Sequence, residues 1–295
     1  MGTEAEQDSI QSLGEAMSDA LDRVEAVGSK RRPLAGLSTG FTDLDALTGG
    51  LMPGTLTVIA ARPSMGRSTL LLNLCTHAAV KNSVPTLHVS LEHSVSETTL
   101  RVKSAEARVA LHHMRSGLMT DDDWTRLAKV IPQIAENPLY FWSPARMNAS
   151  QLTDRAREEV GKRQIGLIAI DGIQDIRPMK RSDLREREVG DVVRDLKSLA
   201  RELNIPLVCT SHLNRGAETR ADRVPMLDDL RESGAITYAA DTIILLHRPD
   251  HYDLASERAG EADFIVAKHR DGPTARITVA FQGHYSRFVQ FAPTA

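Results

Sequence analysis

The fold of this chain is decided by the stretch Leu56-Thr57-Val58-Ile59-Ala60-Ala61-Arg62-Pro63-Ser64-Met65-Gly66-Arg67-Ser68-Thr69-Leu70-Leu71-Leu72. Its first half, with Val58 and Ile59, is typical of a short buried strand. A tight turn with Pro63, Ser64 and Gly66 follows, and an apolar helix begins near Ser68. A strand, a tight loop and a helix N-terminus gather unpaired backbone N–H groups and the positive end of the helix dipole at one point. The stretch therefore predicts an anion-binding site.

The spacing of this loop is that of the phosphate-binding motif Gly-x-x-x-x-Gly-Lys-Ser/Thr, with two departures. Ala61 replaces the first glycine, and Arg67 replaces the lysine. Arg67 keeps the positive charge, but its guanidinium is a wide planar fork where lysine offers a compact ammonium. The Ser68 hydroxyl is the group that such loops place on Mg²⁺. We expect the nucleotide phosphates to contact Ser64, Met65, Gly66, Arg67, Ser68 and Thr69; the alternative is an ordinary strand–turn–helix unit.

Length and composition predict a folded protein without a membrane segment. The chain has 295 residues, of which 41% are hydrophobic and 25% charged, enough for one large α/β domain or two small ones. No apolar run approaches the ~20 residues of a membrane helix, and the acidic N-terminus is no signal peptide, so we expect a cytoplasmic location. The net charge of −3 gives no general attraction to polyanions, so any nucleic-acid surface must be local. Cys75 and Cys209 are expected to be buried, reduced thiols.

The first residues read as an amphipathic helix that is separate from the main domain. Ile10, Leu13, Met17, Leu21 and Val24 recur at steps of three and four among acidic residues. We therefore expect residues 1–33 to form a linker helix and tether, and residues 34–295 to form the main domain. The helix packs either on its own domain or on a neighbouring subunit.

The rest of the chain alternates strands and helices and ends in β-hairpins. Buried strands are predicted at 85–91, 139–142, 165–171, 205–211 and 241–246, and helices at 121–136, 150–163 and 188–203. Ser94 and Glu97 form a capping box at the start of a further helix. A polar, basic loop is expected over 177–187, and antiparallel hairpins over 262–291. This order predicts an α/β fold: a doubly wound, mostly parallel sheet with antiparallel edge hairpins.

Polar residues follow several of these strands at the point where each strand ends. Ligands bind beyond the carboxyl ends of the strands in such sheets, so we expect Glu92, Asp171 and His212 to meet the loop after Ala61. Asp171 suits a Mg²⁺ site, Glu92 suits a general base, and His212 suits a hydrogen bond to a γ-phosphate. Taken singly, the alternatives are a turn cap, a surface glutamate and a loop histidine.

Six motifs in order resemble those of the DnaB replicative helicase family. They are Leu37-Ser38-Thr39-Gly40-Phe41-Thr42-Asp43-Leu44-Asp45, Ala60-Ala61-Arg62-Pro63-Ser64-Met65-Gly66, Ser90-Leu91-Glu92, Ser211-His212-Leu213-Asn214-Arg215, Asp229-Leu230-Arg231-Glu232-Ser233-Gly234 and Ala267-Lys268-His269-Arg270-Asp271-Gly272-Pro273. The resemblance spans about residues 10 to 291. It covers a linker helix and a RecA-like P-loop NTPase domain, without the family's N-terminal helical domain.

The resemblance implies an ATP-dependent helicase motor that needs Mg²⁺, threads single-stranded DNA through a hexameric ring, and works with a loader or primase. It implies that Gly66 and Ser68 lie at the phosphate and Mg²⁺ positions and that Arg67 takes the place of the lysine. In the nucleotide site, the resemblance further implies Glu92 as the base, Asp171 as the Mg²⁺-side acid, Arg101 as a site arginine, and His212 in place of a glutamine. It implies Lys268 and Arg270 as fingers donated to the neighbouring site. It implies Arg231, Glu232 and Gly234 as a DNA-binding loop. ATP or another nucleoside triphosphate is the implied substrate.

Three departures from the family pattern surround one predicted site: Arg67, His212, and Gly172 after Asp171, where the family usually has an aromatic residue. Loss of a well-placed charge-assisted hydrogen bond costs about 1.5–3 kcal/mol, or roughly ten- to a hundredfold in rate. Two hypotheses follow. The first is an active helicase motor; the second is a hydrolysis-impaired paralogue that binds nucleotide and single-stranded DNA and regulates or loads a partner. A third, a RecA-type recombination or clock-type ATPase, shares the fold but is disfavoured by the last two motifs.

Overall fold

The computed structural model describes residues 34–179, 182–230 and 233–291, together with residues 12–14, 17 and 21. Most of the predicted linker helix and tether therefore lies outside the described residues. The same holds for Arg231 and Glu232 of the predicted DNA-binding loop.

The described residues form one nine-stranded sheet in the order β3-β2-β4-β5-β1-β6-β7-β8-β9. The first six strands of this order run parallel: β3 (Leu139–Trp142), β2 (Thr86–Ser90), β4 (Leu167–Asp171), β5 (Leu207–His212), β1 (Leu56–Ala61) and β6 (Thr242–His247). Antiparallel strands complete the other edge: β7 (Glu261–His269), β8 (Ala275–Gln282) and β9 (Arg287–Val289). The predicted doubly wound sheet with edge hairpins is confirmed.

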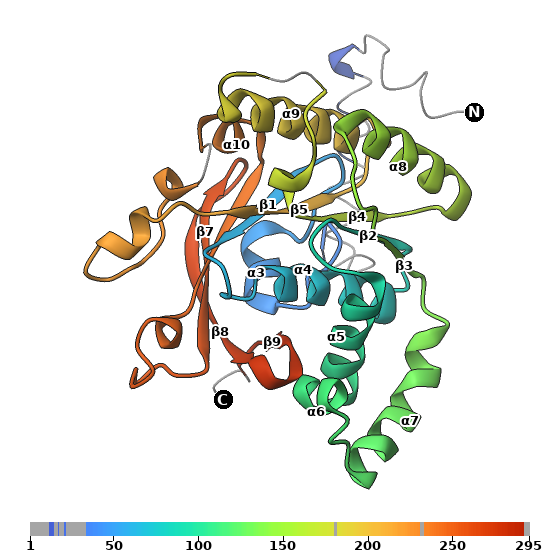
Figure 1. Cartoon of the computed structure of the whole chain (residues 1–295). Helices are drawn as coiled ribbons and strands as arrows, with labels where there is room; N and C mark the ends of the chain where they lie inside the picture. Colours follow the sequence, from blue (N-terminus) through green and yellow to red (C-terminus); the bar gives the residue numbers. More distant parts are fainter. Residues whose placement is uncertain are drawn as a thin grey trace.

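Helices cover both faces of the sheet (Figure 1). On one face lie α8 (Ala149–Arg163), α9 (Arg185–Leu203) and α10 (Ser233–Ala239); on the other lie α3 (Thr42–Thr48), α4 (Arg67–Thr76) and α5 (Val95–Ala107). Each face has its own core: Leu152, Leu196 and Ile168 belong to one, Leu71, Ile59 and Phe264 to the other. The central strands are buried on both sides, which explains why they read as continuous apolar runs.

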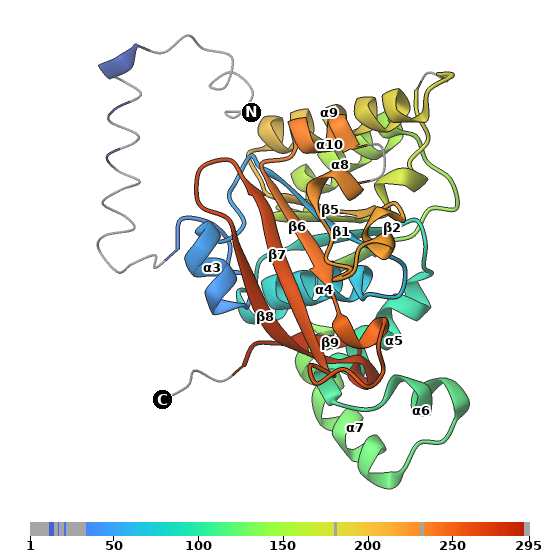
Figure 2. The ribbon, with the colours of Figure 1, turned by 90° about the vertical axis from the view of Figure 1, so that its left-hand side faces the viewer.

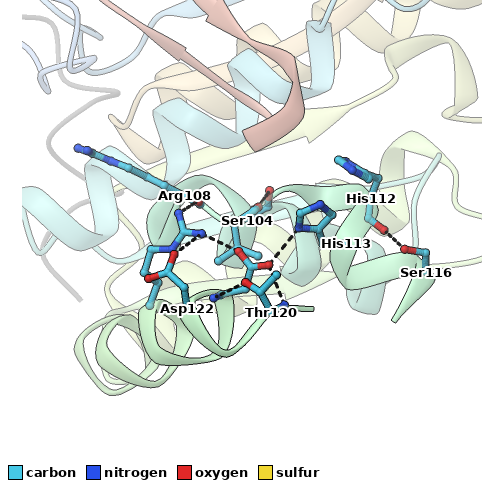
Figure 3. Close-up of polar contacts among 10 residues, drawn as sticks. Ser104, Arg108, His112, His113, Ser116, Thr120 and Asp122 are labelled. Carbon is cyan, nitrogen blue, oxygen red and sulfur yellow. Dashed lines mark hydrogen bonds and ion pairs between the residues drawn. The ribbon is translucent and has the colours of Figure 1, made fainter. Parts of the chain in front are cut away.

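A small lobe projects from the sheet domain after α5 (Figure 2). It consists of α6 (Leu111–Ser116) and α7 (Asp121–Ala135). Thr120 caps α7 in a capping box with Asp123, and His113 Nδ1 lies 3.0 Å from the Asp123 carboxylate. Figure 3 shows polar contacts around His113 and Thr120. Asp122 forms an ion pair of 3.1 Å with Arg126. Polar contacts therefore fix the lobe, which has only a minor apolar core.

Local signals place most elements to within two residues, but three differences remain. The capping box at Ser94 is as expected. Asn148 caps α8, and Gly49 ends α3 in the left-handed conformation. Helices α6 and α10 are missing from the sequence prediction, because both are short and carry no clear period. Helix α9 begins at Arg185, inside the predicted basic loop. Cys75 and Cys209 are buried free thiols, as predicted. Within the described residues, no helix has both the length and the apolar character needed to cross a bilayer.

Candidate functional site

The loop between β1 and α4 adopts the left-handed backbone that its residues permit. Ser64 has φ 64° and Gly66 has φ 102°. At Gly66 a side chain is excluded twice: a Cβ would lie 2.8 Å from Cζ of Phe288, and L-residues avoid this φ. Phe288, on β9, thus fixes the outer side of the loop. The requirement for glycine at position 66 is therefore both steric and conformational.

Helix α4 presents unpaired backbone donors to this loop. Its first α-helical hydrogen bond runs from Leu70 N to the Gly66 carbonyl, at 2.9 Å. Among the described residues, the amides of Arg67, Ser68 and Thr69 have no acceptor, and no side chain caps the helix. A helix N-terminus with open amides is an anion site, because the N–H groups and the helix dipole point to the same place.

Arg67 lies in the site and contacts the predicted base. Its side chain is nearly buried, its Nη2 donates to Oε1 of Glu92, and its Nε is buried without a partner among the described residues. His212 Nε2 lies 3.4 Å from the same Oε1. Glu92 follows β2, His212 ends β5 and Arg67 follows β1, and the strand order β2-β4-β5-β1 brings these side chains together from three different segments, as the sequence predicted.

The charge state of Glu92 follows from these two neighbours. The hydrogen bond from His212, assisted by the charge of Arg67, lowers the pKa of Glu92 to about 2, although partial burial acts in the opposite direction. Glu92 is therefore a carboxylate, and a weak base, while both partners contact it. Loss of either partner would raise its basicity.

Asp171 ends β4 and is held by the neighbouring strand. It is 1% exposed, and its Oδ1 accepts a hydrogen bond of 2.8 Å from Thr210 Oγ1. Thr210 Oγ1 in turn accepts from Gly172 N at 2.8 Å. A hydroxyl from Ser68 and a carboxylate from Asp171 are hard oxygen donors, so this donor set fits Mg²⁺. Arg101, on α5, is half-buried, which lowers its pKa; Asp171, Glu97 and Glu92 are its acidic neighbours.

The predicted finger residues lie at the opposite edge of the sheet. Lys268, near the end of β7, donates to the carbonyls of Thr237 and Ala240 at 2.6 Å, and burial lowers its pKa. Arg270 Nη1 lies 3.1 Å from Asp241 Oδ1. The register that pairs Ile243 with Lys268 places both cations at the amino end of β6, away from the loop that follows β1. Neither residue belongs to the site of its own chain.

Gly234, from the predicted DNA-binding loop, lies in the first turn of α10 rather than in a loop. A Cβ there would approach Glu186 Oε1, on α9, at 3.1 Å. It lines an open cavity of about 760 Å³ together with Thr237, Lys268 and Arg270. Gly234 therefore lies beside the predicted finger residues, whereas Arg231 and Glu232 are outside the described residues.

Three polar residues around these sites were missed by the sequence analysis. Thr210 orients Asp171, and Gln174 joins the turn after β4 to the end of β5: its Nε2 donates to Ser211 Oγ at 2.9 Å, and its Oε1 accepts from His212 N at 3.3 Å. Asp241 accepts from Leu56 N at 2.8 Å and from Lys197 Nζ at 2.6 Å. Gln174 follows Asp171 by three residues, and this proximity is the only sequence signal that points to it.

The parallel sheet, the open helix N-terminus and the acidic strand ends define a RecA-like P-loop NTPase domain. Comparison with known proteins narrows this class. The sequence model of the DnaB-like helicase C terminal domain matches residues 36–290. The chain belongs to this family.

Named relatives and solved structures agree with that assignment. The chain is 45% identical over 292 residues to the replicative DNA helicase DnaB of Leifsonia xyli, covering 99% of this chain and 64% of the relative. It is 33% identical to the replicative DNA helicase DnaC of Bacillus subtilis, covering 95% of this chain and 62% of the relative. This chain thus spans about three fifths of the length of these relatives. These names give no support to a separate regulatory or loading role.

Two solved structures resemble the fold closely, each at 31% identity. The ATPase domain of the protein G40P has a TM-score of 0.90, over 96% of this chain and all of that one. A DnaB-like replicative helicase, described with its interactions with primase, has a TM-score of 0.87 over 97% of this chain and 68% of that chain.

Proposed function

We propose that this chain is the ATP-dependent motor of a replicative-type DNA helicase. The observation that carries the proposal is the meeting of open α4 amides, Arg67, Glu92, His212 and Asp171 at the carboxyl edge of one sheet. Membership of the DnaB-like family supports it. The relevant unit is residues 34–295, preceded by a linker helix and tether over residues 1–33.

Binding of a nucleoside triphosphate rearranges the Arg67–Glu92 pair. Phosphate oxygens at the α4 amides compete with Glu92 for the guanidinium of Arg67. As Arg67 leaves, the pKa of Glu92 rises toward its ordinary value, because one of the positive partners that lower it is lost. The carboxylate then accepts a proton from the attacking water while that water's oxygen bonds to the γ-phosphorus and ADP leaves.

Other side chains hold the reacting groups. Ser68 and Asp171 would hold Mg²⁺, which would supply charge neutralisation at the phosphates. Thr210 orients Asp171 for this role. His212 donates to the γ-phosphate in place of the usual glutamine, and Arg101 adds positive charge on the α5 side.

The fingers act between subunits. Lys268 and Arg270 lie at the edge opposite their own phosphate loop, so they reach a nucleotide only in a neighbouring copy. Positive charge supplied in this way stabilises the transferred phosphoryl group. We therefore propose a ring, hexameric by analogy with the family, in which Arg231, Glu232 and Gly234 hold phosphates of single-stranded DNA.

The linker helix joins neighbouring copies. Leu13, Met17 and Leu21 are exposed and share one helical stripe. Helix α7 exposes Trp124 and Ile131, seven residues apart on its outer side. We propose that the linker stripe of one copy packs on this α7 face of the next, because each apolar surface lacks cover within the described part of the chain.

The family of this chain also indicates the cellular context of the proposed motor. We propose a cytoplasmic protein that acts on bacterial DNA, with a loader or a primase as further partner; the similar solved helicase is described with primase. These assignments rest on family membership.

A steady-state ATPase assay, run with and without single-stranded DNA, tests the proposal. We expect Mg²⁺-dependent turnover that single-stranded DNA stimulates, and its loss in Glu92→Gln, which preserves the shape of the side chain. Turnover equal to that of Glu92→Gln would contradict the motor function. ATP-analogue binding by both proteins controls for folding.

A further inference from the structure

Three side chains beside the candidate nucleotide site form a mixed nitrogen and oxygen cluster. Glu92, His93 and Asp171 each offer one ligand atom, and these atoms lie within 4.8 Å of one another. His93 has no role in the function proposed above. A cluster of one imidazole and two carboxylates differs from the all-oxygen set of Ser68 and Asp171.

The partners of these side chains leave one ligand atom of each residue free. Arg67 and His212 both contact Oε1 of Glu92, and Thr210 contacts Oδ1 of Asp171. His93 Nδ1 lies 4.0 Å from Glu97. Within the described residues, Glu92 Oε2, Asp171 Oδ2 and His93 Nε2 therefore have no polar partner.

The backbone holds the three residues in place. Ser90 and Asp171 are direct neighbours in the β2–β4 register. His93 N donates to Ser90 Oγ at 2.9 Å, and Ser143 Oγ donates to the carbonyls of both Ser90 and His93. These hydrogen bonds therefore hold the loop that carries Glu92 and His93 at both ends, independently of any metal ion.

The charges around Glu92, His93 and Asp171 also favour a bound cation. Three carboxylates, Glu92, Asp171 and Asp175, face two cations, Arg67 and Arg101. A divalent ion would balance the third carboxylate of this group.

We propose that Glu92, His93 and Asp171 bind a divalent transition-metal ion, such as Mn²⁺ or Zn²⁺, in the absence of nucleotide. An imidazole ligand favours these ions, whereas Mg²⁺ prefers oxygen ligands and keeps its waters. The ion binds the carboxylate of Glu92, which the motor uses as its base. Metal binding and nucleotide hydrolysis therefore compete for Glu92. Only this competition rests on the proposed function; the binding itself does not.

Mn²⁺ binding to the nucleotide-free full chain, followed by electron paramagnetic resonance, tests the site. We expect one bound Mn²⁺ that Zn²⁺ displaces and excess Mg²⁺ does not. His93→Leu should weaken Mn²⁺ binding about tenfold or more, as loss of a metal-site interaction does. His112→Leu, on the exposed side of α6, is the matched control and should bind as wild type does.

Two outcomes would overturn the proposal: equal Mn²⁺ binding by wild type and His93→Leu, or displacement of Mn²⁺ by Mg²⁺ as readily as by Zn²⁺. Asp171→Asn, which is isosteric, provides a second ligand variant and should lose Mn²⁺ binding too. The Mg²⁺-dependent turnover of the same proteins separates this result from the motor function, since wild type without turnover can still bind Mn²⁺.

Discussion

Arg67 is the residue that most distinguishes this site from the usual phosphate loop. The guanidinium reaches Glu92 across the site, and its Nε remains buried without a partner among the described residues. A lysine ammonium, smaller and free to rotate, fits between phosphate oxygens as a point charge. Arg67 is hydrogen-bonded to Glu92, the residue that we propose as the base, and this contact is the physical reason to expect weaker hydrolysis.

Arg67→Lys should raise ATP turnover about ten- to a hundredfold. The reason is that a lysine releases Glu92 and restores a point charge between the phosphates, a gain equal to one good charge-assisted hydrogen bond. Steady-state kinetics at saturating ATP measures the effect. Equal kcat values for the two proteins would show that Arg67 does not limit hydrolysis.

His88, on β2, makes the free energy of unfolding depend on pH. It is 3% exposed, its Nδ1 has no partner within the described residues, and burial lowers its pKa to about 4 from 6.5. Between these values the unfolded chain binds a proton that the folded chain excludes. Stability from this residue is therefore complete above pH 6.5 and falls as the pH drops toward 4.

His88→Leu should flatten this part of the stability profile. Wild type is expected to lose about 3 kcal/mol from this group between pH 6.5 and 4, and the variant to lose none of it. Urea unfolding at several pH values measures the difference. Parallel profiles for the two proteins would contradict the assignment; the exposed His112→Leu should follow wild type.

At the scale of elements, Asp241 joins three segments at the amino edge of the sheet. It stands before β6 and binds Leu56 N at the start of β1, Lys197 on α9, and Arg270 after β7. Strand β1 leads directly from this contact to the phosphate loop. One carboxylate thus ties the start of the strand that leads to a chain's own phosphate loop to the finger that we assign to its neighbour.

Asp241→Asn should destabilise the fold by about 2 kcal/mol, because hydrogen bonds to charged groups contribute 1.5–3 kcal/mol. Chemical denaturation measures the cost. Asp191→Asn, which removes an exposed ion pair with Arg194 on α9, should change stability by less than about 0.5 kcal/mol. A similar small effect at Asp241 would argue against its role as a structural link.

At the scale of the whole molecule, the two halves of the proposed reaction lie on opposite edges of one sheet. A single copy cannot bring Arg270 to its own phosphate loop, because β1 lies between them. In the proposed assembly, another copy covers the exposed apolar side chains of the linker and of α7. On this proposal, catalysis requires assembly of several copies.

Trp124→Ala should lower the oligomeric mass measured by light scattering in the presence of an ATP analogue. Trp124 is 60% exposed, so its removal should leave the fold intact while it reduces apolar contact area between copies. Leu254→Ala, at a side chain that is 93% exposed but far along the chain, is the control. An unchanged mass for Trp124→Ala would exclude α7 as the docking face.

Much of the fold could be predicted because its signals are local. The apolar run before Asp171, the capping box at Ser94 and the glycines at the phosphate loop each act within a few residues. The meeting of Glu92, His212 and Asp171 also followed, since parallel strands end at one edge. Helix α10 escaped prediction because it is short and its stability comes from packing on α9.

By itself, then, the sequence determined the alternation of strands and helices, the phosphate loop and the set of residues at the carboxyl edge. Only the tertiary structure decided which of them pair: Arg67 with Glu92, Thr210 with Asp171, and Arg270 with Asp241. The physical reason is that periodicity and turn chemistry are properties of neighbours in the chain. Pairing across a sheet depends instead on strand order and register, which joins residues that no local pattern connects.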